Sequence, residues 1–427
     1  MRVGSIRVSR FRNIQEATLE PSHRLNFFLG KNGQGKTSLV EAISYLSSLK
    51  SFRGSSSDEL LNWQDTQGEI RLRIASEGLP GDDPALSGPQ SELKVTFLRE
   101  SEKVIRTAFI NGKGYRSSSH FLRQRFGNYE LGFHSIVFNP SDHELIRGEP
   151  ALRRQFLDRV LSAENETYLE DLSRYQKVLE QRNSLLKDQE QFGPRSADFQ
   201  NYLKSYTDPL IQLGARITHA RLKWVQKALP RLEKFQKKIA PNQPKAGLFY
   251  RSSFATFFDE KPSNNIGLDL DHFSGQGDPP SIELLEQLYS KKLSDLAMIE
   301  LRSRVTGAGP HRDDWGILLG QHFLHGHGSQ GEVRSALLAL KLTEIENFQE
   351  ETGHRPVLIL DDFSSELDRS RREFLLAFLS ETELQVFVTA TEDPIEAFES
   401  LNDRSAWREK LNGKWFRVDS GQIVEVP

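Results

Sequence analysis

Apolar and polar residues alternate in two segments near the start of the chain, at positions 70–74 and 93–97. This period of two is typical of half-buried antiparallel strands. Residues 78–91 lie between them and are rich in Gly, Pro and Asp, which predicts a surface loop. The apolar run at 25–29 has the length of a fully buried strand. Apart from one helix, the first 115 residues are therefore expected to be mostly strands.

Helical spacing follows directly after the run at 25–29, because residues 39–46 place four apolar side chains on one helical face. The same period of three to four residues returns from about 150 to 230 and again at 284–296. An irregular stretch after Pro241 separates the two. These patterns predict a largely helical lobe in the middle of the chain.

Two later apolar runs, at 357–360 and 384–388, are each preceded by a helical pattern. Alternating helices and short buried strands are typical of a parallel sheet covered by helices. We therefore expect an α/β fold with an inserted helical lobe. The sheet-containing lobe is predicted to comprise 1–120 and 300–427, and the helical lobe 121–299.

The composition is that of a folded globular chain, with 427 residues, 37% hydrophobic and 27% charged. Cysteine is absent, which excludes disulfides, thiolate metal sites and cysteine nucleophiles. The opening MRVGSIRVSRFRN lacks an apolar core, and no later run approaches the roughly 18 apolar residues of a membrane span. A cytoplasmic protein without a membrane partner is therefore expected. The net charge is -3, but residues 151–240 hold 17 basic and 11 acidic side chains, which makes the helical lobe locally basic.

The turn after the first buried strand matches the phosphate-binding pattern G-x-x-x-x-G-K-[ST]. Its residues are Gly30, Lys31, Asn32, Gly33, Gln34, Gly35, Lys36 and Thr37. Glycines let backbone N–H groups point inward around phosphate oxygens, and the following helix adds its positive end. Lys36 would supply a cation to the β- and γ-phosphates, and the Thr37 hydroxyl is a hard ligand suited to Mg²⁺. A nucleotide site is therefore predicted between the strand and the helix.

Two carboxylates, Asp361 and Asp362, follow four consecutive apolar residues at the end of a later predicted strand. Two polar residues can simply end a strand, but a Mg-nucleotide site requires an acidic residue at such a position. Asp361 is predicted to orient the Mg²⁺ shell and Asp362 to polarise the attacking water.

A third segment consists of Ser329, Gln330, Gly331 and Glu332, directly before a helical pattern. Serine and glycine at a helix start make an anion site, although an ordinary helix cap has the same composition. This segment precedes Asp361, and Asp368 follows. Signature, Walker B and D-loop occur in this order in ABC-type ATPases. The predicted fold is therefore an ABC-type ATPase head, a mixed sheet with a P-loop and flanking helices.

Eight segments make a more particular resemblance possible: FRNI, GKNGQGKTS, SFRG, VFNPSDHELIRGEPALRRQFLD, YQKVLEQRN, TGAGPHRDD, GSQGE and LILDDFSSELD. With these the chain resembles the RecF family of bacterial recombination mediators over nearly its whole length. The P-loop and the LDD segment belong to all such ATPases. RRQFLD, LEQRN and GPHRDD are more particular to RecF.

The resemblance implies an SMC-like ATPase head with a helical lobe in place of a long coiled coil. Lys36 and Thr37 match the Walker A residues, and Asp361 matches the Walker B aspartate. Residues 329–332 match the signature that caps the partner's ATP, and Asp368 matches the D-loop aspartate.

Several positions depart from the wider ABC pattern. Asp362 stands where a glutamate is usual, and the strand end after Val388 reads Thr-Ala-Thr without a switch histidine, so slow hydrolysis is expected. Residues 139–142 occupy the Q-loop position without a glutamine, which leaves Asp142 as a candidate on the metal side. Glu332-Val333-Arg334 replaces the glutamine-rich stretch of other RecF chains.

The resemblance also implies ATP-dependent dimerisation on DNA and work with RecO and RecR to load RecA at single-strand gaps. The expected partners are a second copy of the chain, RecR, and gapped DNA or single-strand/double-strand junctions, with ATP and Mg²⁺ as cofactors. Candidate phosphate contacts in the basic lobe are Arg153, Arg154, Arg174, Lys177, Arg182, Arg216, Arg221 and Lys223. The polar cluster at 311–314 is open to two interpretations, a structural ion-pair network or catalysis.

Other functions remain as alternatives. A scaffold that binds ATP structurally and never hydrolyses it is compatible with Asp362 in place of glutamate. An ATP-dependent nuclease of the overcoming-lysogenization type would carry a further acidic metal-binding domain, which nothing in the chain resembles. Transporter ATPases share the nucleotide motifs, but the helical lobe and GPHRDD argue against them.

Overall fold

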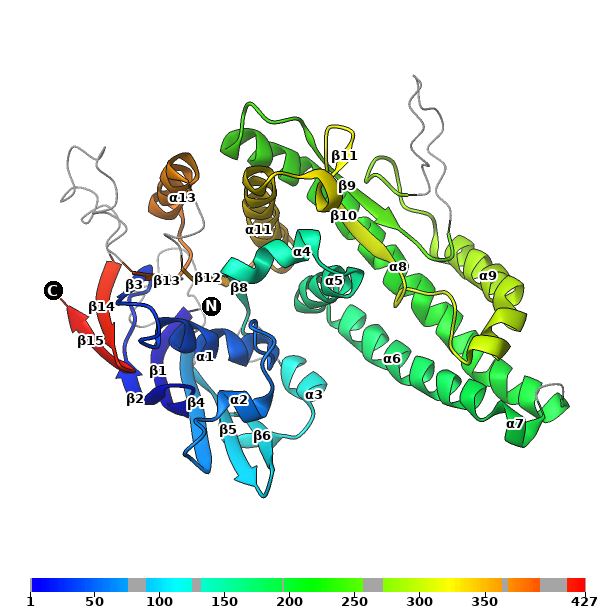
Figure 1. The fold of residues 1–427 in the computed structure, drawn as a ribbon, viewed down its shortest axis with the longest axis horizontal. Coiled ribbons are helices and arrows are strands. Elements are labelled where there is room, and N and C mark those ends of the chain that lie inside the picture. The colour runs from blue at the N-terminus through cyan, green and yellow to red at the C-terminus, as the bar shows by residue number, and fades with distance from the viewer. Residues whose placement is uncertain are drawn as a thin grey trace. The chain divides into compact units, whose positions relative to one another are not determined.

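A computed structural model describes residues 2–75, 90–124, 132–193, 196–255, 272–362, 368–391 and 413–426 (Figure 1). The chain divides into two compact units, one comprising Met1–Asp142 with Phe348–Pro427 and the other His143–Asn347. These limits differ from the predicted ones for two reasons. The strand at Ser135–Phe138 pairs with one of the first unit, and the strand at Asp314–Leu319 pairs within the second.

The first unit contains an antiparallel sheet of six strands in the order β2-β1-β4-β5-β6-β7. Its strands are β1 (Arg2–Phe11), β2 (Ile14–Leu19), β4 (Gln67–Ala75), β5 (Gln90–Glu100), β6 (Lys103–Ile110) and β7 (Lys113–Tyr115). The alternation at 70–74 and 93–97 is confirmed, since these apolar residues are buried and pair across β4 and β5. The predicted loop at 78–91 lies mostly outside the described residues, and its last two positions already belong to β5.

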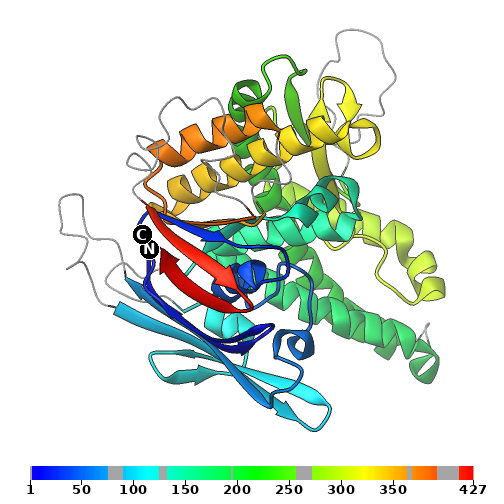
Figure 2. The same cartoon turned by 60° about the vertical axis from the view of Figure 1, so that its left-hand side comes forward.

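A second six-stranded sheet of this unit has the order β15-β14-β3-β13-β12-β8. Its strands are β3 (Leu25–Leu29), β8 (Ser135–Phe138), β12 (Val357–Leu360), β13 (Val386–Ala390), β14 (Gly413–Asp419) and β15 (Gln422–Val426). All neighbours are parallel except β14 and β15. Figure 2 shows the β14–β15 pair beside the early strand β3. The predicted parallel sheet is confirmed, and it places the ends of β3, β12 and β13 at one edge.

Helix α1 (Lys36–Ser48) packs against strands of both sheets, including β1 and β13. The predicted apolar face is buried, and so are the polar residues Ser38, Glu41 and Ser44, because a helix between two sheets has no solvent side. The other helices of the unit are α2 (Ser57–Leu60), α3 (Ser118–Leu122), α13 (Arg369–Glu381) and the short 3-10 turn η1 (Pro140–Asp142).

The second unit is mainly helical, as predicted for this part of the chain. Its helices are α4 (His143–Arg147), α5 (Pro150–Glu164), α6 (Glu166–Lys187), α7 (Gln189–Phe192), α8 (Ala197–Ile239), α9 (Ile282–Ser303) and α10 (Leu324–His327). Helix α11 (Gln330–Thr352) belongs to it as far as Asn347. Helix α8 has 43 residues and packs along α6 and α9 (Figure 1).

A small antiparallel sheet in the second unit was missed by the sequence interpretation. It has the order β11-β10-β9, formed by β9 (Ala246–Arg251), β10 (Asp314–Leu319) and β11 (His322–Phe323). Trp315, Ile317 and Leu319 alternate with less buried residues along β10. That alternation was the available signal, but the partner strand lies in a segment interpreted as irregular.

Among the described residues, none of the helices combines the length and apolar character needed to cross a lipid bilayer.

Candidate nucleotide-binding site

The glycine-rich turn between β3 and α1 needs its glycines for two separate reasons. Gly30 lies against β14, where an added Cβ atom would be 2.2 Å from the carbonyl oxygen of Val418. Gly33 and Gly35 have φ angles of +80° and +110°, a region that other residues avoid. Lys31, Asn32 and Gly33 are exposed at the tip of the turn. The turn therefore has a backbone path that depends on glycine, as is typical of phosphate-binding turns.

Lys36 folds back over this turn. Its Nζ donates to the carbonyl oxygens of Gly30 at 2.6 Å and Lys31 at 2.9 Å. Burial lowers the pKa of Lys36, and the nearby carboxylates of Asp362 and Asp361 act in the opposite direction. The ammonium group thus lies at the mouth of the turn, held by neutral acceptors that an anion can replace.

Asn13 supports the turn and was not singled out from the sequence. Its Nδ2 donates to the carbonyl oxygen of Gly33 at 3.0 Å, and its Oδ1 accepts from the Ser38 hydroxyl at 2.8 Å. On the other side, the backbone N–H of Gly421 donates to the carbonyl oxygen of Gln34 at 2.9 Å. The β1–β2 and β14–β15 turns therefore fix the phosphate-binding turn, and the FRNI segment was the sequence signal for the first of them.

Asp361 lies beside Thr37, although 324 positions separate them in the chain. The Thr37 hydroxyl donates to Asp361 Oδ1 at 3.0 Å, and the Thr389 hydroxyl donates to the same oxygen at 2.7 Å. Burial raises the pKa of Asp361, and the hydrogen bonds from Thr389 and Thr37 partly oppose that shift. Parallel pairing of β12 with β13 brings these groups to one sheet edge.

Asp362 has a left-handed backbone conformation, with a φ angle of +51°. Its backbone N–H donates to the Thr389 hydroxyl at 2.9 Å. Thr389 therefore links the backbone of Asp362 to the carboxylate of Asp361. Sequence reasoning noted this strand end only for its missing histidine and did not assign Thr389 a contact.

The SFRG segment is attached to the same unit through the buried carboxylate of Glu41. Arg12 donates to both Glu41 oxygens at 2.8 and 2.7 Å, and the Ser51 hydroxyl donates to one of them. Arg53 approaches the other at 3.8 Å and is close enough to Asp361 to lower the pKa of that carboxyl slightly. The segment thus brings a half-exposed guanidinium towards the nucleotide site.

The residues at the sheet edge fit a magnesium ion. The Thr37 hydroxyl and the Asp361 carboxylate are adjacent hard oxygens, the ligand type that Mg²⁺ prefers. Within the described ranges, no group of three or more His, Cys, Asp or Glu side chains could hold a metal ion. An ion here would therefore need further oxygens from phosphates and water, as is usual for Mg²⁺ at nucleotide sites.

Two other predicted residues have local partners. Asp368 caps α13, because its carboxylate accepts from the Arg371 backbone N–H and the Ser370 hydroxyl, both at 3.0 Å. Asp142 closes η1, where its two oxygens accept from the backbone and side chain of Asn139 at 3.0 and 2.8 Å. Their roles towards nucleotide and metal stay predictions.

The predicted signature segment lies in the second unit. Ser329 and Gln330 are exposed at the start of α11, and Gly331 and Glu332 are half-buried. Both the backbone N–H and the hydroxyl of Ser329 donate to Glu332 Oε2 at 2.8 Å. The Arg147 side chain of α4 donates to the carbonyl oxygen of Gly328 at 2.7 Å, which fixes the residue before the serine.

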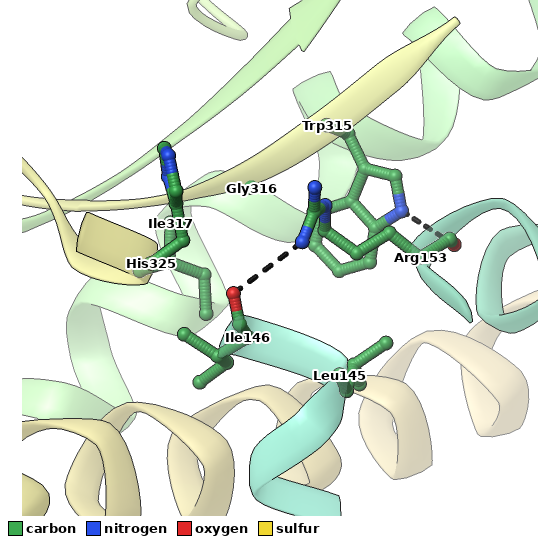
Figure 3. A pocket seen from close by; sticks show the side chains of 7 residues that line it. All are labelled: Leu145, Ile146, Arg153, Trp315, Gly316, Ile317 and His325. Carbon is green, nitrogen blue, oxygen red and sulfur yellow. Dashed lines mark hydrogen bonds between the residues drawn. The ribbon is translucent and has the colours of Figure 1, made fainter. Parts of the chain in front are cut away.

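A cavity of about 10 Å³ lies near α4 and α10 (Figure 3). Its lining residues are Leu145, Ile146, Arg153, Trp315, Gly316, Ile317 and His325. Arg153 donates to the carbonyl oxygen of Ile146 at 3.4 Å, and Trp315 Nε1 donates to the carbonyl oxygen of Arg153 at 2.6 Å. A cavity of this size holds about one water molecule. This cavity therefore cannot hold a nucleotide.

Three of the candidate DNA contacts are buried and form internal ion pairs. The pairs are Arg153–Asp314, Arg182–Glu300 and Arg221–Asp158, with N···O distances of 2.7, 2.6 and 2.7 Å. Their assignment to DNA is therefore corrected, because a guanidinium that is buried in an ion pair with a neighbouring carboxylate cannot reach a DNA phosphate. Arg174, Lys177 and Lys223 are exposed.

The polar cluster at 311–314 is part of the same interior. Asp313 is fully buried and accepts from the Tyr250 hydroxyl and the Ser253 backbone N–H, both at 2.7 Å. Burial lowers the pKa of His311 to about 4, so this imidazole is neutral at physiological pH. Of the two interpretations, the structural network accounts for these contacts.

The two sheets of the first unit and the phosphate-binding turn beside Asp361 are those of an SMC-like ABC ATPase head. The chain matches the RecF/RecN/SMC N terminal domain family over residues 2–403. The Smc head domain from Pyrococcus furiosus shares the fold, with a TM-score of 0.52 at 13% identity over 100% of this chain and 96% of that chain.

Within this class, the chain is more similar to RecF proteins than to this Smc head. The DNA replication and repair protein RecF of Geobacter sulfurreducens is 33% identical over the full length of both chains. A solved structure of the recombination mediator protein RecF with ATP, of the RecFOR pathway, has a TM-score of 0.78 at 27% identity and covers 99% of each chain. The chain belongs to the RecF family.

Proposed function

We propose that this chain is an ATP-dependent DNA-binding protein of recombinational repair and replication. It dimerises with ATP on DNA and hydrolyses ATP slowly. With RecO and RecR, it assists the loading of RecA at single-strand gaps. The observation that carries the proposal is the hydrogen bond between Thr37 and Asp361, which joins the phosphate-binding turn to the Walker B strand.

Triphosphate binding follows from the contacts of the turn. The inward backbone N–H groups and the start of α1 bind phosphate oxygens, and Lys36 exchanges its two carbonyl acceptors for the β- and γ-phosphates. Thr37 and Asp361 would hold Mg²⁺, whose chemistry when bound is to offset the negative charge of the phosphates. The relatives support this role, since RecF has been solved with ATP.

Hydrolysis is assigned to Asp362 as the group that polarises water. An aspartate reaches one methylene less far than a glutamate, and its backbone is fixed by Thr389. Slow turnover is expected for this reason. In the alternative in which ATP is purely structural, Asp362 has no catalytic role, and phosphate release measured with and without DNA separates the two.

Dimerisation is assigned to the exposed signature segment. Ser329, Gln330 and Gly331 of one copy would cap the ATP held by the turn of another, with Asp368 at the contact. Such a shared site makes nucleotide occupancy control association, so a homodimer is the expected active form.

DNA binding is assigned to the exposed basic residues Arg174, Lys177 and Lys223 of α6 and α8. Phosphate contacts of this kind release counterions, so binding should fall steeply with salt and show little sequence preference. RecR is the proposed direct protein partner, with RecO and RecA acting downstream.

The test is sedimentation of the full chain with ATP, with ADP and without nucleotide, repeated with gapped duplex DNA. We expect a dimer only with ATP and a more stable one on the gapped duplex. A chain that remains monomeric with saturating Mg-ATP on every DNA offered would contradict the proposal.

A further inference from the structure

The signature segment already holds an anion of its own. Ser329 donates its backbone N–H and its hydroxyl to the same oxygen of Glu332, each at 2.8 Å. These hydrogen bonds, first from the backbone and then from the side chain of Ser329, lower the pKa of Glu332. The carboxylate is therefore charged at neutral pH and occupies the backbone N–H and the hydroxyl of Ser329.

A phosphate oxygen would need the same donors. Phosphates bind at helix starts through backbone N–H groups and a serine hydroxyl, which are the groups that Ser329 gives to Glu332. One hydroxyl proton cannot serve both acceptors, and two anions at one helix start repel each other. This step rests on the proposed function, in which Ser329 faces the triphosphate of a second copy.

We propose that Glu332 sets the affinity of the shared ATP site, because its carboxylate competes with the partner's triphosphate for Ser329. Closure of the dimer requires this carboxylate to leave the serine. A neutral side chain at position 332 therefore strengthens ATP-dependent association.

An ordinary capping box has the same hydrogen bonds and predicts the opposite result. If Glu332 only stabilised the start of α11, its loss would disorder Ser329 and weaken dimerisation. Ser281 and Glu283 at the start of α9 supply a comparable serine–glutamate contact in the same unit, remote in sequence from the signature. Glu283 is the matched control.

The experiment measures the dimer dissociation constant of the full chain by sedimentation at saturating Mg-ATP. Glu332→Gln keeps the capping box, which accepts glutamine, and removes only the charge. We expect its dissociation constant to be about tenfold lower than that of the unmodified chain, which corresponds to about 1.4 kcal/mol. Glu283→Gln should leave the constant unchanged.

The salt dependence of the dimer dissociation constant is a second measurement, and it should not change if Glu332 has only a structural role. The advantage of Glu332→Gln should shrink between about 0.05 and 0.5 M salt, because screening weakens repulsion between exposed charges. Glu332→Ala, which loses the cap as well, should melt at a lower temperature and still associate more tightly than the unmodified chain.

The outcomes separate the two proposals. If the unmodified chain dimerises with ATP and neither Glu332 variant associates more tightly, competition by Glu332 is refuted and the shared site stands. If the Glu332 variants dimerise without DNA while the unmodified chain dimerises only on gapped duplex DNA, competition by Glu332 is supported. If every variant stays monomeric with saturating Mg-ATP on every DNA offered, the shared ATP site is refuted, and the inference with it.

Discussion

The phosphate-binding turn and the signature segment are both helix starts with serine or threonine and glycine, yet they satisfy their polar groups in opposite ways. In the first, the cation Lys36 rests on two neutral carbonyl oxygens. In the second, the anion Glu332 rests on two Ser329 donors. In the proposed dimer, the first arrangement would attract a triphosphate, whereas at the second the triphosphate would have to displace a like charge. Under that proposal, nucleotide binding and dimer closure have separate energetic controls.

The largest effect is expected from removing the cation of the first region. Lys36→Ala should lower ATP affinity by about 100-fold or more, because several charge-assisted hydrogen bonds are lost, and dimerisation should be lost with it. Equilibrium titration with a fluorescent ATP analogue, followed by sedimentation, measures both. Lys50→Ala, an exposed lysine just after α1, is the control and should bind normally.

A change in the signature segment should affect dimerisation but not ATP binding. Ser329→Arg places a bulky side chain at the exposed start of α11, so ATP-dependent dimerisation should be abolished while the monomer binds ATP as before. Sedimentation and nucleotide titration of the same preparation check this. A Ser329→Arg variant that still dimerises with ATP would rule out the shared site.

A smaller effect is expected at Thr389, which acts on the first region through Asp361. Thr389→Val keeps the shape but removes a hydroxyl that donates to a buried carboxylate, and such bonds contribute about 1.5–3 kcal/mol. ATP affinity titrated over a series of Mg²⁺ concentrations should fall about tenfold. Thr389→Ser restores the donor and should recover most of the affinity, whereas equal losses in both variants would assign Thr389 to packing alone.

The smallest expected effect concerns stability and pH. Burial raises the pKa of Asp361, so ionising this carboxyl in the folded state lowers the free energy of unfolding. The stability of the folded chain is therefore unaffected at low pH, where Asp361 is protonated, and decreases as the pH rises through the folded pKa. Asp361→Asn should therefore make the nucleotide-free chain melt at a slightly higher temperature at pH 7.5. The gain should narrow as the pH is lowered towards 4, and thermal unfolding at both pH values measures it.

Local sequence patterns predicted the phosphate-binding turn and its flanking strand and helix. The buried strand, the glycine turn and the helix are contiguous, so their sequence specifies both the fold and the candidate ligands. Asp361 could be added because a carboxylate after four apolar residues must lie at a strand end.

Contacts between distant segments could not be predicted in this way. Thr389 reaches Asp361 only because β13 lies beside β12, and nothing near either residue encodes that pairing. Arg182 and Glu300 likewise stand on helical segments whose alternating charges look solvated, but they face each other 118 positions apart in a buried interior. A charge pattern on one helix does not show which other helix covers it.

The order of strands around β3 has a consequence for synthesis on the ribosome. Both neighbours of β3 come from the last part of the chain, with β13 beginning 361 positions after β3. At about 5–20 residues per second, translation takes roughly 20–70 s to supply the first of them. During that interval the nascent phosphate-binding strand lacks both of its sheet neighbours, and by its end the intervening helical unit has been synthesised.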